Sequence, residues 1–199
     1  MWRKAALSGD GMKLREKTVI CICGMGGSGK DTVIEYIFNE IKGSIVNGRL
    51  IVEDDLKKRG MEVNNTTLRE HATFMRQSQG MDIIARKSIE WIKKEMENVD
   101  LVVYNLKAMD ELDTLKKELP YRALILGVHA NPRTRFERLK KRGLAYDMKD
   151  YESLVWRDRV ELKWGVGEAF ALADYMIINE GTLGELMEST KKFVKFLAE

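Results

Sequence analysis

Cysteine and proline are scarce in this chain, with two of each among 199 residues. Cys21 and Cys23 lie two positions apart on an apolar run, with no second cysteine pair and no histidine nearby. A zinc site or a disulfide framework would need further ligands or partners. The sequence therefore argues against both and favours buried thiols in a reducing compartment.

Long apolar runs are also missing. No stretch approaches the roughly 18 consecutive apolar residues of a membrane span. Residues 1–17 are polar and have no apolar centre of the kind found in signal peptides. We therefore predict a cytoplasmic protein that makes no membrane contact. Residues 1–17 are expected to form a flexible N-terminal extension, or to follow from an upstream start with Met12 as an alternative initiator.

The net charge is small as well, at a formal +3. Residues 133–163 nevertheless hold ten Lys and Arg against six Asp and Glu, so the positive charge is concentrated in that segment. No aromatic stacking platform accompanies these charges, and we therefore do not expect nucleic acid as a partner. The sequence makes no prediction about oligomeric state.

What the sequence does contain is an alternation of short β-branched runs with amphipathic segments, which is typical of a parallel sheet with helical crossovers. Because the strands are too apolar to face water, helices must cover both faces of the sheet. The prediction is an α/β three-layer sandwich whose ligand site lies outside the carboxyl ends of the strands. The predicted strands are 18–23, 44–46, 99–104, 122–128 and 174–178, and the predicted helices are about 31–42, 49–59, 66–78, 81–97, 109–119, 131–142, 150–164 and 182–197. Thr182 and Glu185 form a capping box at the start of the last helix.

The strongest motif joins the first strand to the first helix and reads Gly24-Met25-Gly26-Gly27-Ser28-Gly29-Lys30-Asp31. A polyphosphate needs many backbone N–H donors at close range, and the four glycines leave those amides uncovered. Lys30 can then reach the β- and γ-phosphates. The pattern predicts a P-loop for ATP, in which the nucleotide-binding residues are Gly24, Met25, Gly26, Gly27, Ser28, Gly29, Lys30, Asp31 and Thr32.

The end of this motif departs from the usual pattern, in which a Ser or Thr hydroxyl ligates Mg²⁺. Asp31 stands there instead. A carboxylate is a good ligand for Mg²⁺, but Asp31 could equally complement the positive end of the helix. The sequence leaves both interpretations open. Thr32, about 100° further round the helix, is an imperfect substitute.

A second group of cations follows the fourth strand. Arg138 and Arg142 are four residues apart and share a helix face, and Arg157 and Arg159 follow in the next helix. Phosphoryl transfer needs cations around the migrating group, and arginines in a closing flap supply them when substrate is present. We predict a helical lid at about 140–165, in which these four arginines act in catalysis together with Lys30.

Three more segments carry a specific pattern: HANPRTRFERL at 129–139, WGVGE at 164–168 and ALADYMIINEGTL at 171–183. With the loop, they make the chain similar to the nucleoside monophosphate kinase group of P-loop proteins, which includes adenylate kinase and dephospho-CoA kinase. Within that group it most resembles an archaeal family described as adenylate-kinase-related. The resemblance covers about residues 18–197 and implies a five-stranded parallel sheet with a mobile lid.

The resemblance also implies roles for single residues. Arg138 would lie against the adenine, and Arg142 with Arg157 or Arg159 would contact the transferring phosphates. The loop after the last strand, with Asn179 and Gly181, would line the base pocket. A plain turn that opens a capped helix is the alternative for that loop, and it needs no ligand.

The acceptor side departs from the family pattern. After the second strand the family has Gly-Asp and then an arginine for the acceptor phosphate, whereas this chain has Arg49 and Val52 in place of the Asp and the Arg. After the third strand the family favours Asp-Gly-x-Arg, whereas this chain reads Tyr104-Asn105-Leu106-Lys107. Arg76 still aligns with a family arginine. The predicted ligands of a phosphate-bearing acceptor are Arg49, Arg76 and Lys107.

Two functions remain open from the sequence. The first is a small-molecule kinase that uses ATP and Mg²⁺ to phosphorylate a nucleoside monophosphate or a similar phosphate-bearing acceptor. The second is a nucleotide-binding switch or a non-catalytic kinase-like subunit, and the changes at Val52, Tyr104 and Lys107 motivate it.

Overall fold

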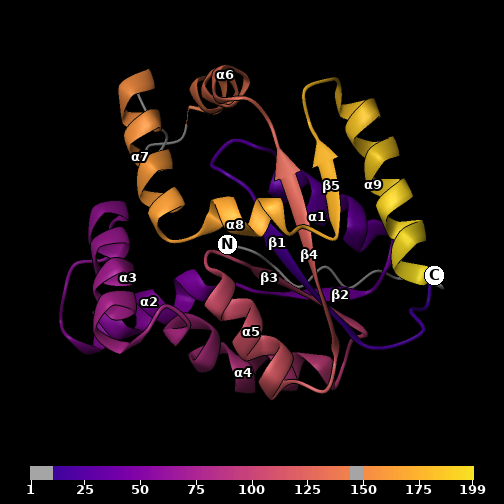
Figure 1. Ribbon diagram of the computed structural model, residues 1–199, viewed down its shortest axis with the longest axis horizontal. Helices are drawn as coiled ribbons and strands as arrows, with labels where there is room; N and C mark the ends of the chain where they lie inside the picture. Colours follow the sequence, from indigo (N-terminus) through magenta and orange to yellow (C-terminus); the bar gives the residue numbers. More distant parts are fainter. Residues whose placement is uncertain (1–10, 144–149) are drawn as a thin grey trace.

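Five parallel strands form the centre of the protein, in the order β2-β3-β1-β4-β5 (Figure 1). The computed structural model describes residues 11–143 and 150–199. The predicted strands are all present, with ends shifted by at most two residues. Their bounds are β1 Thr18–Cys23, β2 Gly43–Val46, β3 Leu101–Asn105, β4 Arg122–His129 and β5 Tyr175–Ile178.

The helices also follow the prediction, apart from one that the sequence did not indicate. They are α1 Lys30–Glu40, α2 Gly48–Lys58, α3 Asn65–Gln79, α4 Ile83–Met96, α5 Met109–Glu118, α6 Pro132–Arg142, α7 Tyr151–Lys163, α8 Val166–Ala171 and α9 Leu183–Ala198. The additional helix is α8, which has six residues and is too short to show a periodic pattern. The predicted capping box of Thr182 and Glu185 is present at the start of α9. Within 11–143 and 150–199, no helix is long and apolar enough to cross a lipid bilayer.

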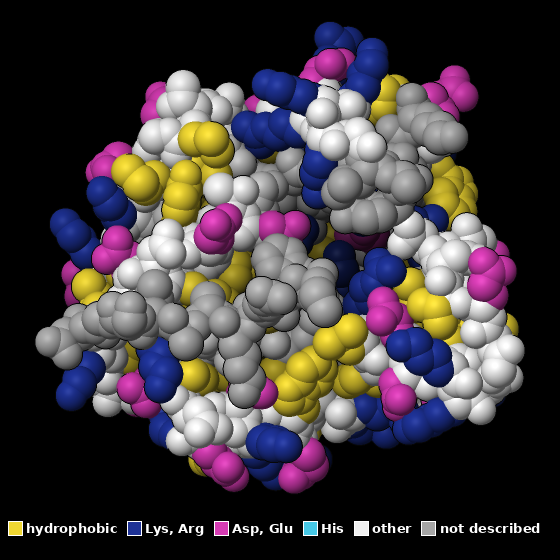
Figure 2. All heavy atoms as spheres, turned by 180° about the vertical axis from the view of Figure 1, so that it is seen from behind, with side chains coloured by type: hydrophobic (Ala, Val, Ile, Leu, Met, Phe, Trp, Pro, Cys, Tyr) yellow, Lys and Arg dark blue, Asp and Glu magenta, His cyan; other side chains and the backbone are white. Residues whose placement is uncertain are grey.

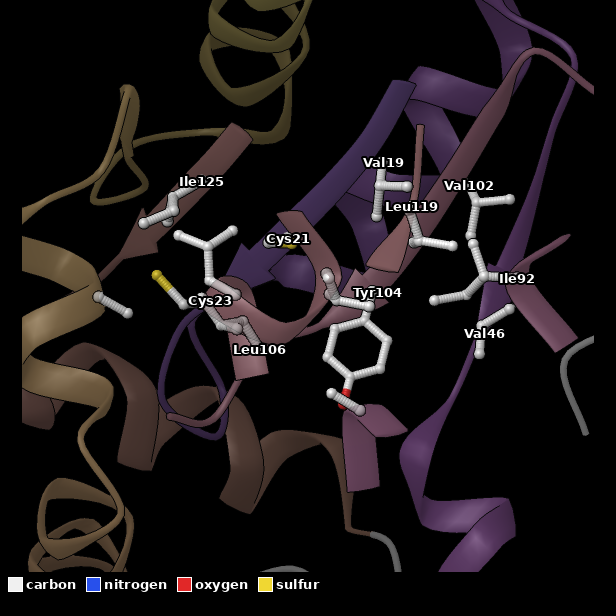
Figure 3. Close-up of a cluster of buried hydrophobic side chains, with 14 of the residues drawn as sticks. Val19, Cys21, Cys23, Val46, Ile92, Val102, Tyr104, Leu106, Leu119 and Ile125 are labelled. Atoms are coloured by element: carbon white, nitrogen blue, oxygen red, sulfur yellow. The ribbon is translucent and has the colours of Figure 1, made fainter. Parts of the chain in front are cut away.

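Helices cover both faces of the sheet, so the predicted three-layer α/β sandwich is confirmed (Figure 1). One core cluster joins β1, β3 and β4 to α1 and α9, and the other joins the opposite face of the sheet to α4, α5 and α8. Cys21 and Cys23 are free thiols in the second of these clusters (Figure 3). Burial raises the pKa of Cys23 to about 11, so its thiol stays protonated and unreactive.

Two helical arms extend from the sandwich. In one, α2 and α3 pack against the start of α4 around Leu56 and Met75. In the other, α6 and α7 pack against each other beyond the arrowheads of β4 and β5 (Figure 1). The predicted lid, 140–165, includes α7, while its residues 144–149 lie outside the described residues. Movement of this arm stays a prediction.

Residues 11–17, which the sequence places in a flexible extension, contact the domain. The Met12 N–H donates to the Glu40 carbonyl at 2.9 Å, and the Lys17 ammonium donates to the Met96 carbonyl. Leu14 packs against the core cluster of α1 and α9. The rest of the predicted extension, residues 1–10, lies outside the described residues.

Candidate functional site

The loop between β1 and α1 has a backbone that only glycine adopts readily. Gly27 and Gly29 have φ angles of 83° and 94°, in the left-handed region. A Cβ on Gly29 would also lie 2.3 Å from the Asn179 side-chain nitrogen, which is a collision. That nitrogen donates to the Ser28 carbonyl at 2.8 Å. The loop is therefore fixed to the end of β5 through Asn179.

Lys30 begins α1, and its ammonium folds back against the loop. It donates to the carbonyl oxygens of Gly24 at 2.5 Å and Met25 at 3.3 Å. Burial and the charge of Lys107 lower the pKa of Lys30 from 10.5 to about 8, while Glu161 acts in the opposite direction. Lys30 forms no ion pair with a carboxylate in the described part of the chain. A desolvated ammonium with only carbonyl partners gains from contact with a phosphate.

A pocket of about 680 Å³ lies between the loop and the two helical arms, and its volume suits a nucleotide-sized ligand. It brings together residues from the loop, from both arms and from the end of β3. The predicted site residues that line it are Gly26, Gly27, Gly29, Lys30, Asp31, Thr32, Arg49, Arg76, Lys107, Arg138, Arg142 and Arg157.

The remaining predicted site residues do not line the pocket. Four are buried next to it, namely Gly24, Met25, Ser28 and Asn179. Two others, Arg159 and Gly181, are exposed. Arg159 follows Arg157 by two positions, which turns it to the other side of α7. The structure therefore separates these two arginines, and only Arg157 points toward the loop.

Arginines connect α6 and α7 to the loop. Arg135, which the sequence analysis did not single out, is 3% exposed and donates to the Gly26 carbonyl at 3.1 Å. It also forms an ion pair with Asp158 of α7 at 2.5 Å. Arg138, the predicted adenine contact, donates to the Asn179 carbonyl at 3.0 Å. Arg157 lies so close to Gly26 that a Cβ there would be 3.0 Å from its guanidinium carbon.

Glu161 of α7 joins the lid arm to the end of β3. Its carboxylate accepts from the Lys107 ammonium at 2.9 Å and from Arg157 Nε at 3.2 Å. Burial disfavours the charged form, yet Lys107 and Arg157 together lower the pKa of Glu161 to about 2. The carboxylate therefore stays charged and holds two of the predicted site cations.

The other predicted acceptor cations are also paired. Arg49 donates to Glu53 of the same helix at 2.7 Å. Arg76 donates to Glu111 at 2.8 Å, with side-chain exposures of 3% and 0%. The Arg76 guanidinium also lies over the Trp164 ring, 4.9 Å from its centroid. Arg76 is thus a buried, paired residue of the pocket wall.

Archaeal proteins of similar length match nearly the whole chain. A UPF0200 protein of Staphylothermus marinus is 33% identical over 181 residues, which cover 91% of this chain and 93% of that protein. A UPF0200 protein of Thermococcus kodakarensis is 32% identical over 178 residues, with 88% and 96% coverage. The chain belongs to the UPF0200 family. A comparison with protein-family models gives no match.

Solved structures place this UPF0200 member among P-loop kinases by fold. A gluconokinase from Sinorhizobium meliloti superposes with a TM-score of 0.54 at 14% identity, covering 94% of this chain and 95% of that one. A shikimate kinase from Bacteroides thetaiotaomicron gives 0.54 at 12% identity, with 90% and 97% coverage. At this identity the likeness concerns the fold alone, and it agrees with the predicted P-loop sandwich. The predicted resemblance to an archaeal family is confirmed by the UPF0200 relatives.

Sequence reasoning missed three charged residues that line the pocket of this UPF0200 member, namely Arg69, Glu111 and Glu161. Arg69 precedes Arg76 by seven residues, so the shared face of one helix was a usable signal. Its guanidinium lies 5.4 Å from the centroid of the Trp156 ring on α7. The two glutamates left no such signal, because their partners are 35 and 54 residues away in the chain.

Asp31 is the only carboxylate in the first turn of α1, where it is exposed and lines the pocket. Within 11–143 and 150–199 no group of three or more His, Cys, Asp or Glu is arranged to hold a metal. Mg²⁺ commonly binds through one or two carboxylates together with substrate phosphates and water. The residues present therefore fit an ion that arrives with a nucleotide.

Lys and Arg side chains gather over α6 on the face that Figure 2 shows. The exposed ones on this helix are Arg133, Lys140, Lys141 and Arg142. Arg142 also lines the pocket, so part of this positive charge faces the candidate site. The expectation that nucleic acid is not a partner stays a prediction.

Proposed function

We propose that the protein is an ATP-dependent phosphotransferase that phosphorylates a small molecule bound between its two helical arms. The observation that carries the proposal is Lys30, a half-buried lysine whose ammonium has only carbonyl partners among the described residues, set on a glycine loop that lines a nucleotide-sized pocket. The shared fold with gluconokinase and shikimate kinase structures supports the same conclusion.

On the donor side, the loop amides and Lys30 hold the β- and γ-phosphates of ATP. Asp31 would hold Mg²⁺ together with the phosphate oxygens, and the ion supplies charge neutralisation when it is bound. Arg138, Arg142 and Arg157 of α6 and α7 line the same pocket, and Arg157 lies against Gly26 of the loop. Their charges stabilise the migrating phosphoryl group, and the arm excludes water.

The transfer itself needs little covalent help from the protein, since positioning and electrostatics supply most of the effect. An acceptor oxygen forms the new bond to the γ-phosphorus. The bond from that phosphorus to the bridging oxygen breaks, and ADP leaves with the electron pair. This uses ATP and the acceptor alone.

A coupled assay of ADP formation tests the proposal. We expect ATP turnover that depends on an acceptor, in a panel that includes nucleoside monophosphates, dephospho-CoA, sugars and nucleosides. Each reaction is run with Mg²⁺ and repeated with EDTA. Tight ATP binding without turnover on any acceptor would contradict the proposal.

That contrary result would favour a nucleotide-binding switch or a non-catalytic kinase-like subunit. One observation supports this second candidate. The nucleoside monophosphate kinase pattern has an aspartate and an arginine at the end of the third strand. At the end of β3 this protein has a buried tyrosine, Tyr104, in place of the aspartate, and Lys107 in place of the arginine. Loss of that carboxylate removes a group that helps to organise Mg²⁺ or the nucleophile in the family.

ATP binding is expected to weaken as the pH rises above 8. Free Lys30 has a pKa of about 8, and contact with phosphates raises the pKa of an ammonium. The bound state therefore retains a proton that the free state loses. By this linkage the affinity falls about tenfold between about pH 7 and pH 9.

Calorimetric titration with ATP and Mg²⁺ at several pH values measures this trend. Two buffers of different ionisation enthalpy reveal the proton uptake. Lys30→Arg is the matched control, because its guanidinium stays charged throughout. A pH-independent affinity in the wild type would show that Lys30 does not touch the phosphates.

Nucleotide binding is also expected to change the fluorescence of Trp156. Arg157 lies against Gly26, where phosphates bind, so a nucleotide must contact or displace it. The adjacent Trp156 is 56% exposed and packs against Arg69 of the other arm. Movement of α7 would therefore alter its surroundings. Titration of ATP and Mg²⁺ into the wild type and Trp156→Phe isolates its signal, and equal changes in both proteins would argue against a moving lid.

A further inference from the structure

Three residues that line one part of the pocket each carry a buried polar atom without a hydrogen-bond partner of ordinary length in the described chain. These atoms are the Tyr104 hydroxyl, the Asn105 side-chain oxygen and Arg76 Nε. Tyr104 is fully buried, and Arg76 is 4% exposed. Buried polar groups are nearly always hydrogen-bonded, so several unpaired ones in one cavity indicate where polar atoms of a ligand belong. A fourth such atom, Ser28 Oγ, belongs to the phosphate loop instead.

The walls beside these atoms are apolar and closely fitted. They are formed from α2, α3 and α4 by Val52, Leu68, Ala72 and Ile84. Gly48, at the start of α2, has no room for a side chain, since a Cβ there would lie 2.5 Å from Ile84 and 3.9 Å from the Tyr104 hydroxyl. Figure 3 shows the Tyr104 ring extending from β3 with its hydroxyl directed away from Val19 and Leu119.

The charges in this part of the pocket cancel. Arg76 is neutralised by Glu111, whose second oxygen accepts from the Lys107 backbone N–H at 3.0 Å. The Lys107 side chain is in turn neutralised by Glu161 at 2.9 Å. A phosphate dianion placed here would face the Glu111 carboxylate and would have to break a buried ion pair. An uncharged group would leave both pairs intact.

We propose that the acceptor is an uncharged alcohol, of the class of sugars, cyclitols and nucleosides, whose hydroxyl groups bind Tyr104, Asn105 and Arg76. Arg76 Nε donates to a ligand oxygen, and the Asn105 oxygen accepts from a ligand hydroxyl. The Tyr104 hydroxyl can do either. Arg69 and the lid arginines remain on the side of α7, where the transferring phosphates lie.

The inference rests on the proposed phosphotransferase activity and narrows its substrate. One ligand hydroxyl oxygen forms the bond to the γ-phosphorus as the bond to the bridging oxygen breaks. ADP carries away the electron pair, and the hydroxyl proton passes to solvent. The product is the phosphate monoester of the alcohol.

The test is a coupled assay on the full-length chain with ATP and Mg²⁺. One panel holds D-ribose, D-glucose, myo-inositol and the common nucleosides, and the other holds AMP, CMP, GMP, UMP and ribose 5-phosphate. We expect a neutral compound to raise ADP formation at least tenfold, while the monoesters leave it near the acceptor-free rate. Turnover with monoesters alone would overturn this inference and leave the kinase proposal intact, whereas turnover with neither panel would overturn both.

Tyr104→Phe supplies the second readout. We expect about a tenfold rise in KM for the active alcohol, with the affinity for ATP unchanged, because one neutral hydrogen bond to the acceptor is lost. The Ser88 hydroxyl is near enough to interact weakly with that of Tyr104. It donates to the Ile84 carbonyl at 2.8 Å, and the Tyr104 hydroxyl makes no hydrogen bond of ordinary length in the described chain. Its removal should therefore not lower the melting temperature.

The matched control is Tyr121→Phe, at a residue just before the start of β4. This substitution should change neither the KM for the alcohol nor the melting temperature. An unchanged KM in Tyr104→Phe, or a lowered melting temperature, would contradict the assignment.

Discussion

Replacing Lys30 by Ala is expected to lower kcat/KM for phosphate transfer by about 10³-fold, because one preorganised cation at the migrating phosphoryl group is worth about that much. Its ammonium is the charge closest to the loop, held by the Gly24 and Met25 carbonyls. The affinity for ATP should fall in parallel. Steady-state kinetics and calorimetry measure the two effects separately.

The control for this substitution is Lys58→Ala. The side chain of Lys58 is 73% exposed and pairs only with Asp54 of the same helix. Its loss should leave both quantities unchanged. A Lys30→Ala variant that keeps the wild-type affinity for ATP would mean that the nucleotide binds elsewhere.

Replacing Glu111 by Ala is expected to destabilise the protein by about 3–5 kcal/mol, the usual cost of removing one partner from a buried ion pair. Arg76 would keep its charge inside the protein with no carboxylate. The Lys107 N–H would lose its acceptor as well. Urea denaturation measures the change in the free energy of unfolding.

The double substitution Arg76→Met with Glu111→Leu separates charge from packing. It removes both charges and keeps most of the volume, so it should recover most of the lost stability. If Glu111→Ala does not fold, a folded double variant still supports the explanation. A Glu111→Ala variant as stable as the wild type would show that Arg76 is not paired with Glu111 in solution.

The phosphate loop and the sheet could be predicted because their signals are local. Four glycines and a lysine between an apolar run and a helix leave few other structures. The alternation of strands and helices then fixed the layers. By contrast, the six residues of α8 carry no period that a sequence pattern can reveal.

The acceptor side could not be predicted because it depends on long-range pairs. In the sequence, Arg76 has no carboxylate nearby that would indicate its partner. The fold brings Glu111, 35 residues away in the chain, into contact with it. Lys107 likewise meets Glu161 across 54 residues. The sequence therefore predicts three cations for a phosphate-bearing acceptor, whereas the structure shows each of them with a carboxylate partner.

The lid arginines illustrate an intermediate case. Their positions on α6 and α7 were predictable, but the direction of each side chain was not. Arg157 and Arg159 both looked suitable, and only Arg157 lines the pocket. Arg135, which lies in the HANPRTRFERL segment but received no predicted role, connects the loop to α7 through Gly26 and Asp158.

The most direct test of the central claim is a crystal structure with a non-hydrolysable ATP analogue and Mg²⁺. We expect the polyphosphate on the backbone amides between Gly26 and Asp31, with the Lys30 ammonium moved from its carbonyl partners to the β- and γ-phosphate oxygens. A nucleotide bound outside this loop, or a loop whose amides turn away from the phosphates, would contradict the account.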